Sequence, residues 1–73
     1  MKTVEEIRKE LGISKADFSK LINMSLRTYY GRFDGSQPDW LLKEVVEISK
    51  LNKGNVRFQL NDKTYDISIK EID

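Results

Sequence analysis

Residues 14–33 carry four basic side chains and a single acidic one, a charge of +3 in a chain of 73 residues whose total charge is only +1. Hydroxyl and aromatic side chains lie between the basic ones, in the run SLRTYYGR at positions 25–32. Cationic and hydroxyl side chains are common donors to phosphate oxygens, and an arginine can bridge two acceptors at once. An ordinary solvated surface shows a charge excess of this size about as often as a binding surface does. The run is therefore a candidate binding surface, and its geometry depends on the elements that hold it.

The residues that most often perform catalysis are missing from the sequence. The chain has no His and no Cys, which removes the usual general base at neutral pH, the usual nucleophile pairs and the nitrogen and sulfur ligands of metal sites. The acidic residues near helix starts fit capping roles, and no glycine-rich phosphate loop is present. We therefore expect no enzyme activity, no metal and no cofactor.

The length limits the chain to one small domain, because 73 residues sustain only one core. Leu, Ile, Val and Phe make up 21 of the 73 residues, above the roughly 20% below which chains stay disordered. We expect one domain over residues 1–73. Domains this small usually need a disulfide, a metal or oligomerisation, and the composition leaves oligomerisation. The sequence shows neither a spanning apolar run nor a secretory segment, so we expect a cytoplasmic protein without membrane contact.

Hydroxyl-led segments predict three helix starts. Thr3 begins a capping box with Glu6, Ser14 begins a second with Asp17, and Ser25 can cap a third helix. Periodic apolar residues then predict one helix from Thr3 to Gly12, one of about two turns from Ser14, and helices over Leu26–Phe33 and Trp40–Asn52, with Asn23 in a tight turn. The apolar side chains that we expect to face inward are Val4, Ile7, Leu11, Phe18, Leu21, Ile22, Tyr29, Phe33, Trp40, Leu41, Leu42, Val45, Val46 and Ile48.

After Gly54 the apolar spacing changes from helical to alternating, which predicts a β-hairpin over residues 55–70. A two-residue Asn61-Asp62 turn would pair Phe58 with Tyr65 on one face and Arg57 with Asp66 on the other. The predicted fold is therefore α+β: a helical part over residues 3–53 and a C-terminal antiparallel hairpin.

The stretch KADFSKLINMSLRTYYGRFDG at positions 15–35 resembles the helix-turn-helix of the Cro and phage-repressor (XRE-like) superfamily. Together with the first helix and the helix that Pro38 leads, the similarity covers about residues 4–51. The spacing is that of the family throughout, with a small residue where the helices cross and F-D-G at the end. The family usually has Gln, Ala, Gly and an aliphatic residue at the positions of Lys15, Ser19, Asn23 and Tyr29. Asp34 departs further, because members with Asn there can donate to a phosphate.

The resemblance implies a sequence-specific double-stranded DNA-binding transcriptional regulator of a phage or other mobile element. Its recognition helix, about residues 25–33, would lie in the major groove. Two other readings stay open: an architectural DNA binder such as an excisionase, which assists recombination, and a protein-interaction module that has lost DNA binding.

Several residues of the candidate DNA surface have an alternative role. Arg27 would bridge guanine O6 and N7 or point into solvent. Leu26 would contact a thymine methyl or form a hydrophobic staple, and Tyr30 would contact a base or sugar or pack partly against the core. Gly31 would allow close approach to DNA or relieve crowding between Tyr30 and Phe33. The candidates for phosphate contacts are Lys15, Ser25, Thr28 and Arg32, of which Arg32 can instead pair with Asp34.

The hairpin is a candidate dimer interface. Its apolar face needs cover, its edges carry unpaired backbone groups, and Cro-like proteins dimerise through C-terminal strands. We expect a homodimer on an inverted repeat, joined through Val56, Phe58, Tyr65, Ile67 and Ile69. The alternative is that the hairpin covers the helical core of a monomer.

Overall fold

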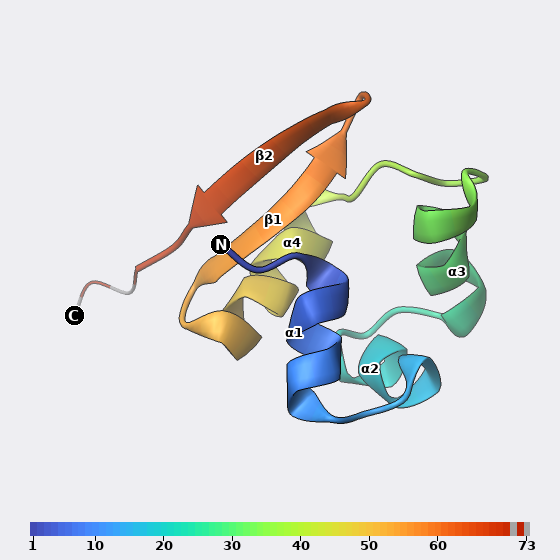
Figure 1. Ribbon diagram of the computed structural model, residues 1–73, viewed down its shortest axis with the longest axis horizontal. Helices are drawn as coiled ribbons and strands as arrows, with labels where there is room; N and C mark the ends of the chain where they lie inside the picture. The colour runs from blue at the N-terminus through green and yellow to red at the C-terminus, as the bar shows by residue number, and fades with distance from the viewer. Residues whose placement is uncertain (71, 73) are drawn as a thin grey trace.

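A computed structural model describes residues 1–70 and 72 as a small α+β domain, in which four helices precede a C-terminal two-stranded antiparallel hairpin (Figure 1). The elements are α1 (Val4–Leu11), α2 (Lys15–Leu21), α3 (Leu26–Asp34), α4 (Leu42–Ser49), the 3-10 helix η1 (Lys50–Asn52), β1 (Asn55–Leu60) and β2 (Lys63–Ser68). The predicted fold class and element order are confirmed. None of the helices within these described residues is long and apolar enough to cross a membrane.

The predicted helix starts are confirmed at the level of single atoms. The hydroxyl of Thr3 accepts from the amide of Glu6 at 3.3 Å, and those of Ser14 and Ser25 accept at 3.1 Å from the amide three residues later. Asn23 has a φ of 59° in the turn before α3, a conformation that asparagine tolerates well. Local sequence signals therefore fix where the first three helices begin.

The predicted start of α4 at Trp40 is wrong by two residues. Trp40 is buried in the core, as expected, but its backbone lies beside β1, where its amide donates to the carbonyl of Gln59. The helix begins only after Leu41, whose amide donates to the Glu44 carboxylate at 2.8 Å. Leu41 and Leu42 were expected inside, yet they are exposed because they precede or open the first turn.

Aromatic side chains meet at the centre of the core. The Tyr29 ring is fully buried and packs edge-on against Phe18, Phe33 and Trp40, with ring centroids 5.1–6.3 Å apart.

Phe33 was also expected inside but is 47% exposed, because it lies in the last turn of α3 beside an open hollow of about 310 Å³. Leu11 and Leu21, the last residues of α1 and α2, are likewise exposed. The buried apolar residues are Val4, Ile7, Phe18, Ile22, Tyr29, Trp40, Val45, Ile48 and Val56.

The hairpin has the predicted register, with Phe58 opposite Tyr65 and Arg57 opposite Asp66. The chain itself lies along the outer edge of β1. Near the N-terminus, the Lys2 carbonyl accepts from the Arg57 amide at 2.8 Å, and the segment before α4 contacts the same edge, where the Trp40 amide donates to the Gln59 carbonyl. In Figure 1 the N-terminus accordingly lies beside β1, while β2 forms the outside of the hairpin. The open edge of the hairpin is therefore that of β2.

Candidate nucleic-acid interface

Helices α2 and α3 form a tightly joined pair. Ser19 is buried where the helices meet, and its hydroxyl donates to the Ala16 carbonyl at 2.8 Å. The Met24 amide donates to the Ser19 carbonyl, which fixes the turn between the two helices. A residue larger than serine would separate the helices at this point. The small residue at position 19 and the left-handed Asn23 therefore set the direction in which α3 leaves the turn.

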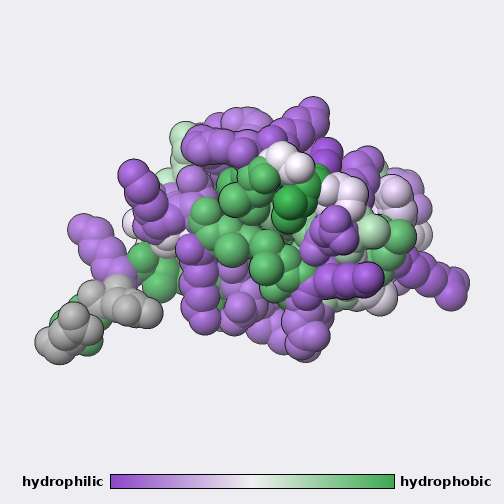
Figure 2. All heavy atoms as spheres, turned by 90° about the horizontal axis from the view of Figure 1, so that it is seen from below, coloured by the Kyte–Doolittle hydropathy of each residue, from purple (hydrophilic) through white to green (hydrophobic). Residues whose placement is uncertain are grey.

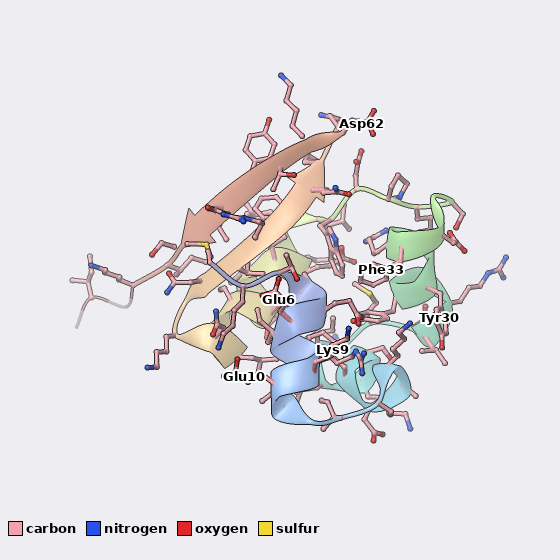
Figure 3. The ribbon with its side chains drawn as sticks, in the orientation of Figure 1. Glu6, Lys9, Glu10, Tyr30, Phe33 and Asp62 are labelled. Carbon is pink, nitrogen blue, oxygen red and sulfur yellow. The ribbon has the colours of Figure 1, made fainter. Side chains whose placement is uncertain are left out.

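The N-terminal half of α3 presents a free surface. Arg27 is exposed, Leu26 and Tyr30 are 38% and 47% exposed, and Thr28 is half-buried. Figure 3 shows Tyr30 on the part of α3 nearer α2, while Phe33 lies towards α1 and the hairpin. The structure thus brings together most of the predicted DNA-contact residues, which are Ser25, Leu26, Arg27, Thr28 and Tyr30.

Lys15 at the start of α2 belongs to the same surface. Its ammonium nitrogen lies 5.3 Å from the centroid of the Tyr30 ring, within the range of a cation–π contact. A cation from α2 is therefore held beside the exposed aromatic side chain of α3.

Gly31 is buried and does not lie on this surface, so it has no exposed position from which to approach DNA. The loop after α3 folds back over it, with the Gln37 amide donating to the Gly31 carbonyl at 2.9 Å. A Cβ atom at position 31 would lie 3.1 Å from Ser36 Oγ and 3.2 Å from Gln37 Cβ. Glycine is needed because the loop packs against the helix there. The loop therefore limits the candidate surface to the first half of α3.

Arg32 is buried, and the structure contradicts its assignment as a phosphate contact. Its guanidinium donates to both carboxylate oxygens of Glu44 and to the Gln37 carbonyl, at distances of 2.7–3.2 Å. It also lies 5.6 Å from the Trp40 ring centroid. The alternative pairing with Asp34 is also wrong. With all its donating nitrogens engaged inside the protein, Arg32 holds α3 against α4.

Asp34 ends α3 in a local turn. Its carboxylate accepts from the amide and the hydroxyl of Ser36, at 2.8 and 2.7 Å. These two hydrogen bonds lower the pKa of the Asp34 carboxyl below its ordinary value. The carboxylate therefore shapes the loop that covers Gly31.

An open hollow of about 610 Å³ adjoins the N-terminus of α3. Ser25 and Thr28 line it from one side, and Gln37 and Lys43 line it from the loop and α4. Neither Gln37 nor Lys43 was predicted to belong to the site. Nothing in the sequence distinguishes them from other polar surface residues, and only the packing of α4 against α3 brings them near the candidate surface.

The residues predicted to form the dimer interface fall into two groups. Val56 is fully buried, and Phe58 and Ile67 pack against the core of the same chain. The prediction that Val56 forms a dimer contact is therefore wrong, because the helices of its own chain cover it. Tyr65 is 43% exposed and Ile69 is partly exposed. The hairpin thus covers the monomer core, as the alternative reading expected.

A second, apolar surface lies on the underside of the domain. Figure 2 shows hydrophobic side chains gathered there, with hydrophilic ones around them. The lower ends of α1 and α2 lie on this side in Figure 1, and both helices end in an exposed leucine, Leu11 at 44% and Leu21 at 54%.

Within residues 1–70 and 72, no group of three or more acidic side chains could hold a metal ion.

Comparisons with family models, curated proteins and solved structures found no match to this chain.

Proposed function

We propose that this protein is a sequence-specific double-stranded DNA-binding transcriptional regulator of the Cro and repressor type, from a phage or other mobile element. In this proposal the first half of α3 enters the major groove, whose width of about 12 Å accepts one helix. One observation carries it: the free face of α3 presents Arg27 and Tyr30 beside Lys15, while the opposite face is fixed in the core through Tyr29. Such a regulator would act in the cytoplasm, where it would occupy an operator.

Each side chain of the surface has a specific role in the proposal. Arg27 bridges guanine O6 and N7, and Leu26 and Tyr30 provide apolar contacts to base edges or sugars. Lys15 and the Ser25 and Thr28 hydroxyls contact phosphates. Lys43 and Gln37 extend the phosphate contacts along the hollow that they share with Ser25.

A short reading surface favours a dimer. Because the loop after α3 packs against Gly31 and Arg32 is buried, the proposed reading surface ends at Tyr30 and one protomer reads only a few base pairs. Two recognition helices about 34 Å apart would read successive turns of an inverted repeat. We propose that the homodimer forms along the outer edge of β2, since the chain itself already lies along the outer edge of β1.

The hydrogen-bond pattern identifies the free backbone groups of that edge. The Ile69 amide donates to the Gly54 carbonyl, and antiparallel pairs alternate between hydrogen-bonded and non-hydrogen-bonded. In this register the amides of Thr64, Asp66 and Ser68 point away from β1. Three alternate amides are thus oriented to pair with a second strand.

The apolar underside favours a second candidate function. A module that binds another protein would use exposed apolar side chains such as Leu11 and Leu21 at the ends of α1 and α2, since contiguous exposed apolar surface often marks a protein interface. The charge of only +1 is compatible with this reading.

Selection from random duplex DNA, followed by titration of the bound sequences against salt, tests the proposed function. We expect an enriched sequence with two half-sites and an affinity that falls steeply with salt as phosphate counterions are released. Binding without sequence preference but with strong bending of the DNA would favour the architectural reading. The absence of duplex binding at low salt would contradict DNA recognition and leave the protein-interaction reading.

A further inference from the structure

A chain of polar contacts connects α3 to α1 and to the loop before α2. The hydroxyl of Tyr29, on the buried face of α3, donates to Glu5 Oε1 at 2.7 Å. Arg8 Nη2 donates to Glu5 Oε2 at 2.8 Å, and Arg8 Nη1 donates to the Ile13 carbonyl at 2.8 Å. Ile13 directly precedes Ser14, which caps α2, and Lys15, which contacts Tyr30. The two helices that carry the proposed DNA surface are therefore both tied to α1.

The protonation states of Glu5 and Tyr29 at neutral pH favour these hydrogen bonds. Burial alone would raise the pKa of the Glu5 carboxyl, but hydrogen bonds from Arg8 and Tyr29 outweigh it and lower the pKa. Burial and the bond to Glu5 raise the pKa of the Tyr29 hydroxyl. Glu5 thus stays an ionised acceptor, and Tyr29 stays a protonated donor.

Hydrogen bonds constrain α3 in a way that apolar packing does not. The ring contacts of Tyr29 with Phe18 and Trp40 stabilise burial, but the hydrophobic effect has no direction. A hydrogen bond weakens steeply as its angle departs from linear. A rotation of α3 by about 20° would move side-chain tips at a helix radius of 5–6 Å by roughly 2 Å. A displacement of that size separates a base-reading arginine from its acceptors.

We propose that Glu5 and Arg8 are positioning residues for the DNA-reading surface, which set the rotation of α3 relative to α2 through the Tyr29 hydroxyl. This inference rests on the proposed function. Neither residue lies on α2 or α3, so their contribution is to hold Arg27 and Tyr30 in reading geometry. Loss of the network should reduce discrimination between sequences more than it reduces contact with phosphates.

The test compares Tyr29→Phe with the parent protein on the selected DNA and on a scrambled duplex at one salt concentration. Tyr29→Phe keeps the buried ring and removes only the hydroxyl. We expect the ratio of cognate to scrambled affinity to fall about tenfold, the scale of one hydrogen bond, with an unchanged salt slope. Glu5→Gln keeps an oxygen that can accept from Tyr29, so its ratio should fall less.

Val56→Ala serves as the control for lost stability. Val56 is buried in β1 and its side chain takes no part in the hydrogen bonds of the network, and temperature can be adjusted so that the folded fractions match. If the specificity ratio is unchanged in Tyr29→Phe, or falls equally in Val56→Ala, the positioning role is refuted.

A second measurement separates this inference from the proposed function. Residual dipolar couplings of the full chain report the orientation of α3 relative to α2 and α1 without any DNA. We expect Tyr29→Phe to rotate α3 and Val56→Ala to leave it in place. An unchanged orientation in Tyr29→Phe overturns the positioning role. If the parent protein instead shows no sequence preference, the proposed function fails, and the couplings still decide what Glu5 and Arg8 do.

Discussion

Arg32 in α3 and Glu44 in α4 form a buried ion pair, in which the Arg32 Nη2 atom lies 2.8 Å from both carboxylate oxygens. The same carboxylate caps α4 by accepting from the Leu41 amide. On the other flank of α3, Tyr29 donates to Glu5 of α1. Helix α3 is therefore anchored by polar contacts to α4 and to α1, in addition to its apolar packing.

Glu44→Ala should strongly destabilise the fold. Removing one partner leaves the Arg32 guanidinium buried without its counter-charge, which typically costs about 3–5 kcal/mol. Urea unfolding of the variant and the parent measures this difference. Glu47→Ala, one helical turn further on, removes only an exposed pair with Lys50 and should cost no more than about 1 kcal/mol. Equal losses in the two variants would mean that the buried pair adds nothing specific.

Gly54→Ala should destabilise the protein far more than Gly12→Ala. Both glycines have positive φ, 83° and 70°, where a Cβ costs roughly 1–2 kcal/mol. At Gly54 that Cβ would also lie 2.0 Å from the Ile69 carbonyl oxygen, whereas at Gly12 nothing lies within 4 Å. The melting temperatures of the two variants measure the difference. Similar melting temperatures would show that the hairpin can move away from position 54 at no cost.

Stability should fall as the pH is lowered below about 4. The pKa of Glu5 is lowered from 4.5, and those of Asp34 and Asp66 from 3.8, by hydrogen bonds in the folded structure. The unfolded chain therefore binds more protons near these values, so the stabilisation is complete above the unfolded pKa and is lost as pH falls through the folded one. Unfolding experiments between pH 6 and pH 2 measure the slope. Glu5→Gln should have a shallower slope, and an identical slope would remove Glu5 from this effect.

Ser68→Pro should abolish dimer formation while leaving the monomer folded. The Ser68 amide points away from β1, and proline is tolerated on edge strands where no ladder bond is lost. Sedimentation of the variant, the parent and Ser68→Ala, which keeps the amide, measures the effect. We expect dimers for the parent and Ser68→Ala, and monomers for Ser68→Pro. A parent protein that stays monomeric both free and on DNA would refute the dimer.

Local signals in the sequence predict the backbone of this domain well. Each of Thr3, Ser14 and Ser25 caps a helix with its own hydroxyl, and Asn23 adopts the left-handed turn. The alternating pattern after Gly54 predicts the hairpin register, because a shift by one residue would turn the apolar side chains to the other face.

The parts of the candidate site that were mispredicted depend on distant residues. Arg32 has no signal of burial in its own helix, because its partner Glu44 lies twelve residues further on. Gly31 is covered by a loop whose path depends on Asp34 and Ser36. Hydrophobic periodicity likewise could not reveal that Val56 is covered by helices of its own chain. Helical position predicts which side chains share a face, but the rest of the chain decides whether that face is free.

Arg27→Ala, assayed by repeated site selection beside the parent protein, tests the central claim most directly. Arg27 is exposed in the free half of α3, and a bidentate contact to guanine contributes about 1–3 kcal/mol of discrimination. We expect the variant to lose preference at one base pair of each half-site and to keep it elsewhere. Lys15→Ala, the control, should weaken binding to all sequences alike and reduce the salt slope by about one. An unchanged preference profile for Arg27→Ala would contradict the claim that the first half of α3 reads the DNA sequence.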